Sequence, residues 1–117
     1  MILPQYFAHL DGPQPMDGLA KASPDVRFLI ALPDRAIEGN GQSDLHEYIA
    51  NRGPAAQGRV HNLRVSATHG DVEFHYGLVQ EQGATMGMLL AAAHITPDGR
   101  FDRYLCMFQS RVPLLGD

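Results

Sequence analysis

The sequence predicts an α+β fold in which helices from the first half of the chain pack into a strongly curved, mixed or antiparallel sheet. Up to Gly53, apolar residues recur mostly at helical spacing, around one short strand. After Gly53 they alternate with period two between turn motifs, as in a meander of long antiparallel strands. The length of 117 residues and the hydrophobic content of 44% suit one globular domain, which we expect to span residues 1–117.

The first half is expected to contain three helices and one strand. The segment ILPQYFAHL has its apolar residues at helical spacing and tolerates a proline in its first turn. A second short helix is expected in PMDGLAKA, and DVRFLIAL alternates like a strand. The segment SDLHEYIANRG indicates a helix that begins with Ser43 as its N-cap and ends at Gly53.

The second half is expected to form four strands separated by three turns. The turns are His69–Gly70, a looser turn around Gly83, and a Pro-Asp-Gly turn within Thr96–Arg100. In the segment TMGMLLAAAHI both alternating sets of residues are apolar, so this strand needs cover on both faces. Because helices can cover only one face, we expect a homodimer joined through the outer face of the sheet.

Composition excludes several classes of partner. Nine basic residues against thirteen acidic ones give a net charge of −4, which disfavours nucleic acid and anionic membranes as partners. No segment has the roughly 20 consecutive apolar residues of a membrane helix. Cys106 is the one cysteine, which rules out an internal disulfide and thiolate metal centres. We therefore expect a cytoplasmic protein without a metal or cofactor.

Three histidines lie between Val60 and Leu78. If His69 and Gly70 are the centre of a tight hairpin, His61 and His75 fall on opposite faces and His69 at the tip, which excludes a shared metal. His75 is then expected at a solvated or interface position. His61 is the one titratable group on the apolar face, and it is either a core histidine or a site residue. The expected pairs on that apolar face are Val65 with Phe74, Leu63 with Tyr76, and His61 with Leu78.

Five segments carry a resemblance that covers almost the whole chain. They are YFAHLDG, SPDVRF, EGNGQSDLHEYIA, RVHNLRV and DGRFDRYLCMF, in this order. Together they resemble the nuclear-transport-factor-2-like superfamily, and within it the SnoaL-like and ketosteroid-isomerase-like branch. The resemblance implies a cystatin-like α+β cone with an apolar pocket at its open end, and pairing of two chains through the outer face of the sheet.

The resemblance also implies roles for two residues. Tyr6 falls where steroid isomerases of this superfamily place a tyrosine that donates a hydrogen bond to the substrate oxyanion. His61 falls near the general-base histidine of several dehydratases. The two aspartates of the steroid isomerases correspond to Ile30 and to Ala91 or a neighbour, so steroid isomerisation is not expected.

Periodicity and the resemblance together predict a ligand pocket. Besides Tyr6 and His61, its expected lining is Phe28, Ile30, Tyr48, Phe74 and Tyr76, with Ala91, Tyr104, Cys106 and Phe108 from the last two strands, whose inward face is ambiguous.

Two functions remain open at this point. One is a lyase or isomerase that acts on a small apolar carbonyl or hydroxy compound, with Tyr6 as hydrogen-bond donor and His61 as base. The other is a non-catalytic dimeric module that binds a hydrophobic ligand or a partner chain.

Overall fold

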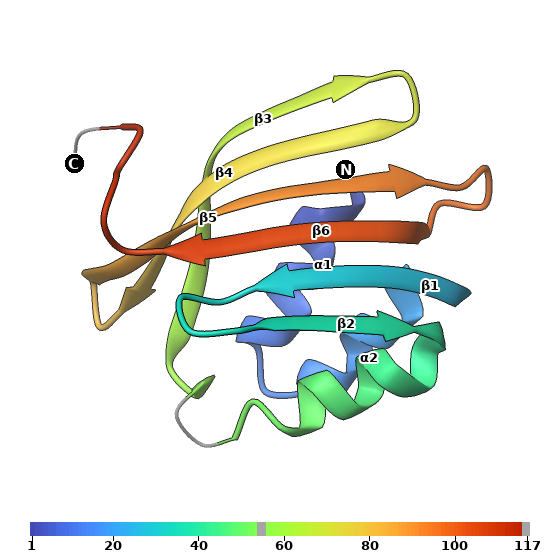
Figure 1. Ribbon diagram of the computed structural model, residues 1–117, viewed down its shortest axis with the longest axis horizontal. Coiled ribbons are helices and arrows are strands. Elements are labelled where there is room, and N and C mark those ends of the chain that lie inside the picture. The colour runs from blue at the N-terminus through green and yellow to red at the C-terminus, as the bar shows by residue number, and fades with distance from the viewer. Residues whose placement is uncertain (54–55, 116–117) are drawn as a thin grey trace.

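A computed structural model describes residues 1–53 and 56–115, and in them helices lie on one side of a six-stranded sheet (Figure 1). The helices are α1 (Ile2–Asp11), the 3-10 helix η1 (Pro15–Lys21) and α2 (Gly41–Ala50). The strands are β1 (Ala22–Ala31), β2 (Ala36–Asn40), β3 (Arg59–His69), β4 (Val72–Glu81), β5 (Ala84–Ile95) and β6 (Phe101–Gln109).

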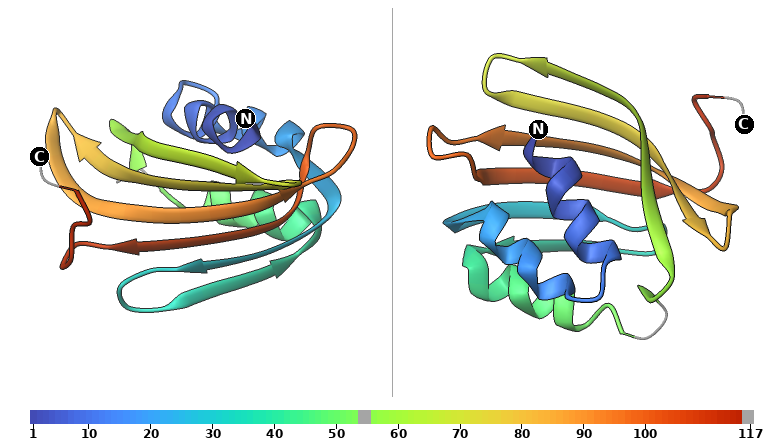
Figure 2. Two further views of the ribbon diagram at one scale, coloured as in Figure 1. Left: turned by 90° about the horizontal axis from the view of Figure 1, so that it is seen from above. Right: turned by 180° about the vertical axis from the view of Figure 1, so that it is seen from behind.

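The sheet has the order β2-β1-β6-β5-β4-β3 and is mixed. The pair β1–β6 is parallel and the other neighbouring pairs are antiparallel. Figure 2 shows the sheet curling around α1 and η1 without closing into a barrel, while the opposite, outer face carries no helix of the described residues. The predicted α+β class, with N-terminal helices inside a strongly curved mixed sheet, is confirmed.

The core lies between the helices and the inner face of the sheet. Helix α1 buries its apolar stripe there, and β1 buries alternate residues, as the periodicities predict. The register of β5 and β6, ambiguous in the sequence, places Ala91 opposite Cys106 and Ala93 opposite Tyr104 on the inner face. The buried residues of α1 and β1 are Leu3, Tyr6, Phe7, Leu10, Ala22, Val26, Phe28 and Ile30.

The segment before α2 differs from the prediction. It forms β2, and α2 begins at Gly41 with Asn40 as its N-cap instead of Ser43. The backbone N–H of Asn40 donates to the Asp44 carboxylate at 2.8 Å, which closes this helix end. Two glycines make the arrangement possible: Gly41 has φ of 86°, and at Gly39 a Cβ would collide with the Phe28 ring. Short glycine-rich strands of this kind give little period-two signal.

The β3–β4 hairpin has a different register from the predicted one. His69 pairs with Val72, so the turn is Gly70–Asp71, and of these only Gly70 has a positive φ, at 57°. Farther from the turn a β-bulge lies between Leu63 and Val65, and β3 bends strongly there (Figure 1). The bulge moves the first part of β3 by one residue, which reverses the face to which its side chains point.

Candidate functional site

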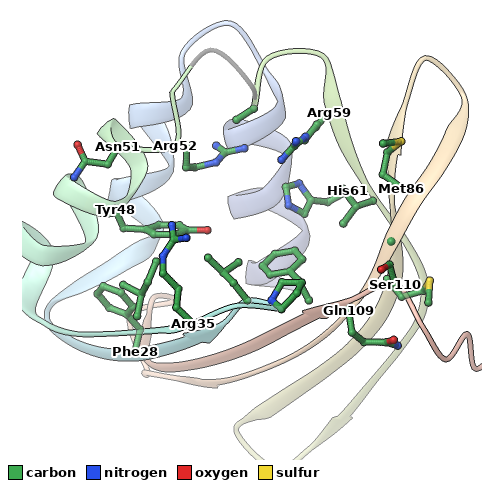
Figure 3. A pocket seen from close by; sticks show the side chains of 18 of the residues that line it. Phe28, Arg35, Tyr48, Asn51, Arg52, Arg59, His61, Met86, Gln109 and Ser110 are labelled. Carbon is green, nitrogen blue, oxygen red and sulfur yellow. The ribbon is translucent and has the colours of Figure 1, made fainter.

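A cavity of about 670 Å³ lies at one end of the cone, between α2, the β1–β2 connection, the start of β3, the start of β5 and the end of β6. Figure 3 shows polar side chains around it, among them Arg35, Tyr48 and Arg59, with Phe28 and Met86 at opposite sides. Its polar lining includes Arg35, Tyr48, Arg52, Arg59, His61 and Gln109, and its apolar lining includes Phe28, Leu32, Ile37, Val79, Met88 and Phe108.

His61 lines this cavity and is paired with Asp11, the last residue of α1. Its ring Nδ1 lies 2.6 Å from Asp11 Oδ1, and its backbone N–H donates to Asp11 Oδ2 at 2.7 Å. Both side chains are nearly buried, with 7% of His61 and 12% of Asp11 exposed. A carboxylate can only accept in this bond, so Nδ1 carries a proton, and in the neutral ring Nε2 keeps its lone pair. In this arrangement Nε2 of the neutral ring is able to accept a proton.

Packing holds the His61 ring from both sides. It stacks on Phe7 of α1 with ring centroids 4.7 Å apart, and it meets the Phe108 ring of β6 edge-on at 6.0 Å. The bulge after Leu63 is what turns His61 toward α1, since without it the alternation that places Val65 outward would also place His61 outward.

Sequence reasoning missed Asp11. The residue ends the first helix, where the negative end of the helix dipole disfavours a carboxylate. An acidic residue at the end of a helix therefore suggests that a hydrogen-bond donor such as a histidine faces it, because such a donor offsets the unfavourable interaction with the helix dipole.

Tyr48 of α2 also lines the cavity, and Figure 3 shows its hydroxyl directed into it. Burial raises the pKa of this phenol, while the nearby positive charges of Arg52 and Arg35 act in the opposite direction. Tyr48 therefore stays protonated at neutral pH and can donate a hydrogen bond to a ligand oxygen.

Tyr6 is not among the residues that line the cavity. It is fully buried in the core, in edge-on contact with Phe101 and Tyr104 at centroid distances of 5.0 and 5.7 Å. Burial raises the pKa of its phenol, and its hydroxyl has no hydrogen-bond partner among the described residues. Tyr6 and His61 therefore do not face the same space. Tyr6 points from α1 into the core under the sheet, whereas His61 is hydrogen-bonded to Asp11 at the C-terminal end of α1.

The remaining predicted lining residues divide into three groups. Phe28, Tyr48 and Phe108 line the cavity, as does His61. Ile30, Ala91, Tyr104 and Cys106 belong to the core and are not among the lining residues. Burial raises the pKa of the Cys106 thiol to about 12, which leaves it protonated and unreactive at neutral pH.

Phe74 and Tyr76 lie on the outer face of the sheet, contrary to the prediction. Phe74 is 46% exposed, and Tyr76 packs with Leu78 and Met88 away from the main core. The Tyr76 hydroxyl accepts a hydrogen bond from the backbone N–H of Leu114 at 2.9 Å. The alternation of apolar and polar residues along β4 was identified correctly, but its apolar face is the outer face of the sheet and not the inner one.

His75 is buried on the inner face, which corrects its expected solvated or interface position. Its Nε2 lies 2.8 Å from Glu73 Oε1, and its Nδ1 lies 2.7 Å from the hydroxyl of Ser66. Glu73 in turn accepts the backbone N–H groups of Ile2 and Leu3 at the start of α1. Polar side chains can face inward here because each has a hydrogen-bond partner.

No three histidine, cysteine or acidic side chains in residues 1–53 and 56–115 come together in a way that could hold a metal ion. None of the helices in that part of the chain has the length and apolar character required to span a bilayer.

Comparison with known proteins defines the fold. The sequence matches no protein-family model and no curated protein. A crystal structure assigned as an isomerase of the SnoaL-like family, from Agrobacterium tumefaciens, is similar with a TM-score of 0.76 and 16% identity, over 93% of this chain and 95% of that one. The yeast UBP3-associated protein BRE5 has a TM-score of 0.75 and 9% identity, over 93% and 92% of the two chains.

A third similar structure, from Novosphingobium aromaticivorans, is a nuclear-transport-factor-2-like protein with a cystatin-like fold. Its TM-score is 0.67 and its identity 16%, over 95% of this chain and 79% of that chain. At such low sequence identities, structural similarity shows a shared fold and not a shared activity. The chain therefore has the nuclear-transport-factor-2-like cone fold that its sequence resemblance predicts.

Proposed function

We propose that this protein binds a small, largely apolar carbonyl or hydroxy compound in the cavity and acts on it as a lyase or isomerase. The observation that carries the proposal is the His61–Asp11 pair, a nearly buried imidazole oriented by a carboxylate at the wall of a partly apolar cavity. A crystal structure assigned as an isomerase of the SnoaL-like family shares the fold, and we propose the same class of reaction for this chain on the strength of the His61–Asp11 pair. We also propose that the protein is located in the cytoplasm.

In the proposed reaction, Nε2 of His61 removes a proton from a carbon next to the substrate carbonyl. The C–H electron pair becomes the C=C bond of an enolate, whose oxygen accepts a hydrogen bond from the Tyr48 hydroxyl. When the substrate carries a C=C bond next to that carbon, the enolate is a dienolate, and return of the proton from His61 to the far carbon of the dienolate completes an isomerisation. Loss of a neighbouring hydroxyl group, which leaves as water with that proton, completes an elimination. Tyr48 takes the donor role that the resemblance implies for Tyr6, because Tyr48 lines the cavity.

A screen of isomerisation and dehydration substrates, followed by two variants, tests the assignment. His61→Gln removes the base and should lower kcat by about 10²–10⁴-fold. Asp11→Asn keeps the size of the side chain but removes the charge that orients the ring, so it should lower kcat and shift the pH profile. His46→Gln on the exposed side of α2 is the matched control. Full turnover by folded His61→Gln would refute the role of His61.

A second candidate function, the non-catalytic dimeric module, is favoured by the outer face of the sheet. Two rows of directly paired residues cross it, and several of their members are large, apolar and about half exposed. Contiguous exposed apolar residues are typical of a surface that binds another protein chain. The rows are Ala67, Phe74, Ala92 and Leu105, and Val65, Tyr76, Leu90 and Met107. We propose that a second copy of the chain covers them.

A further inference from the structure

The cavity contains two arginines whose side chains are half buried and which no other part of the described chain neutralises. Arg52 follows α2 and Arg59 begins β3, and both line the cavity (Figure 3). No carboxylate of the described residues forms an ion pair with either side chain. Arg52 donates to the backbone carbonyl of Leu10 at 3.4 Å, and the buried Nε of Arg59 has no hydrogen-bond partner among the described residues.

The acidic residues of the cavity do not cancel these charges. Glu38, Asp44 and Glu47 are exposed residues of β2 and α2 at the rim. Asp44 already accepts the backbone N–H of Asn40. The third arginine of the lining, Arg35, is itself exposed and paired with Asp34 at 3.4 Å. Exposed charges are screened by solvent, whereas half-buried guanidiniums keep more of their attraction for an anion.

Arg59 is also placed to orient a ligand toward His61. The two residues are separated by one residue on β3, before the bulge, so their side chains leave the same face of the strand with Cα atoms roughly 6–7 Å apart. An anionic group held by Arg59 would lie beside His61, and the rest of the ligand would extend over the apolar lining formed by Val79 and Phe108.

We propose that Arg52 and Arg59 form a carboxylate-binding subsite, so that the ligand of this cavity is a small apolar carboxylic acid. This inference rests on the proposed function and specifies its substrate class. The planar donor fork of a guanidinium matches the two oxygens of a carboxylate. The rim acids favour a monoanion over a doubly charged phosphate, because each of them repels the ligand.

Binding of 3-phenylpropionate and of its uncharged amide, measured by calorimetry, tests the subsite without an activity assay. The acid should bind the wild-type protein at least about tenfold more tightly than the amide, as expected for charge-assisted hydrogen bonds. Arg52→Gln and Arg59→Gln should each reduce that preference and leave amide binding unchanged. The matched control is Arg103→Gln, an exposed arginine of β6 outside the cavity lining.

Two further measurements cover the case in which Arg59→Gln does not fold. Arg59→Lys keeps the charge without the fork and should keep part of the preference. In the wild type, raising NaCl from about 20 mM to about 500 mM should weaken binding of the acid and not of the amide.

The outcomes separate the two proposals. Equal binding of acid and amide by the wild type would overturn the subsite and leave the proposed function intact. Failure of both probes to bind at millimolar concentration would contradict the proposed function, and the subsite with it.

Discussion

Replacing Glu73 by glutamine tests how the sheet holds the N-terminus of α1. The nearly buried Glu73 carboxylate accepts the backbone N–H of Ile2 at 2.6 Å and that of Leu3 at 3.2 Å, and it bonds to His75 at 2.8 Å. Glutamine offers one neutral oxygen in place of two charged ones, and its NH₂ group would face a donor. At least one buried donor is therefore left without a partner.

The expected loss is about 2–4 kcal/mol of unfolding free energy, because hydrogen bonds to a charged group contribute about 1.5–3 kcal/mol and an anion at a helix N-terminus adds less than about 1 kcal/mol. In a domain of this size that corresponds to a decrease in Tm of roughly 8–15 °C. Glu47→Gln, on the exposed side of α2, makes the same chemical change without these bonds and should stay within about 0.5 kcal/mol of the wild type.

The pH dependence gives an independent check. Burial alone would raise the pKa of Glu73, but the hydrogen bonds from Ile2, His75 and Leu3 outweigh it and hold the pKa below its ordinary value of 4.5. A carboxyl whose pKa is lowered by folding stabilises the protein above its unfolded pKa, and this stability is lost as the pH falls through the folded value. The wild type should therefore lose stability below about pH 4.5, and the gap to Glu73→Gln should narrow.

Urea denaturation followed by circular dichroism at pH 7 and at about pH 3 measures both effects. A Glu73→Gln variant as stable as the wild type at pH 7 would refute the proposed role of Glu73. So would a difference in stability that is the same at both pH values.

Three other substitutions test separate parts of the structure. Tyr6→Phe removes a buried hydroxyl without a partner, so stability should stay equal or rise by up to about 1 kcal/mol in thermal unfolding; a clear loss would show that the hydroxyl is bonded. Leu105→Glu on the outer face should convert a dimer to a monomer in light scattering during size exclusion, with His46→Gln on the exposed side of α2 as control, and an unchanged mass would contradict the interface. Gly77→Ala should lower the unfolding free energy by about 1–3 kcal/mol in urea denaturation, because the added Cβ would lie 2.6 Å from the carbonyl oxygen of Asn62. Gly12→Ala, whose Cβ would lie 3.3 Å from its nearest atom, should lower it less, and equal effects of the two substitutions would argue against the close approach at Gly77.

The parts of the fold that local periodicity determines were predicted correctly. Helix α1 was identified from its apolar stripe, β1 from its alternation, and the meander from its turns. The inner face of β5, which includes Leu89 and Ala91, follows one of the two alternating sets. These features depend on residues that are close in sequence, which is why a single sequence suffices to find them.

The candidate site was predicted only in part, because its geometry depends on contacts between distant segments. His61 was found as the titratable group on an apolar strand face, but its partner Asp11 lies fifty residues earlier in the chain. Arg52 and Arg59 line one cavity from different segments of the chain, and no periodicity encodes that cavity. The inward position of Glu73 and His75 was missed because Glu73 is satisfied by the backbone of α1, about seventy residues away, and His75 by Glu73 and Ser66.

The misplaced residues of β4 and the predicted dimer have one physical explanation. Phe74 was expected inside the cone because an apolar strand face usually packs on a core, yet it lies half exposed on the outer face, in the same row of paired residues as Leu105. If a second copy covers this face, the apolar side chains are buried after all, but between two sheets instead of under the helices. The inner face of β4 then carries Glu73 and His75, and Glu73 accepts hydrogen bonds from the first backbone N–H groups of α1. The Leu105→Glu experiment therefore tests both points: a chain that is monomeric from the start would leave the apolar outer face without this explanation.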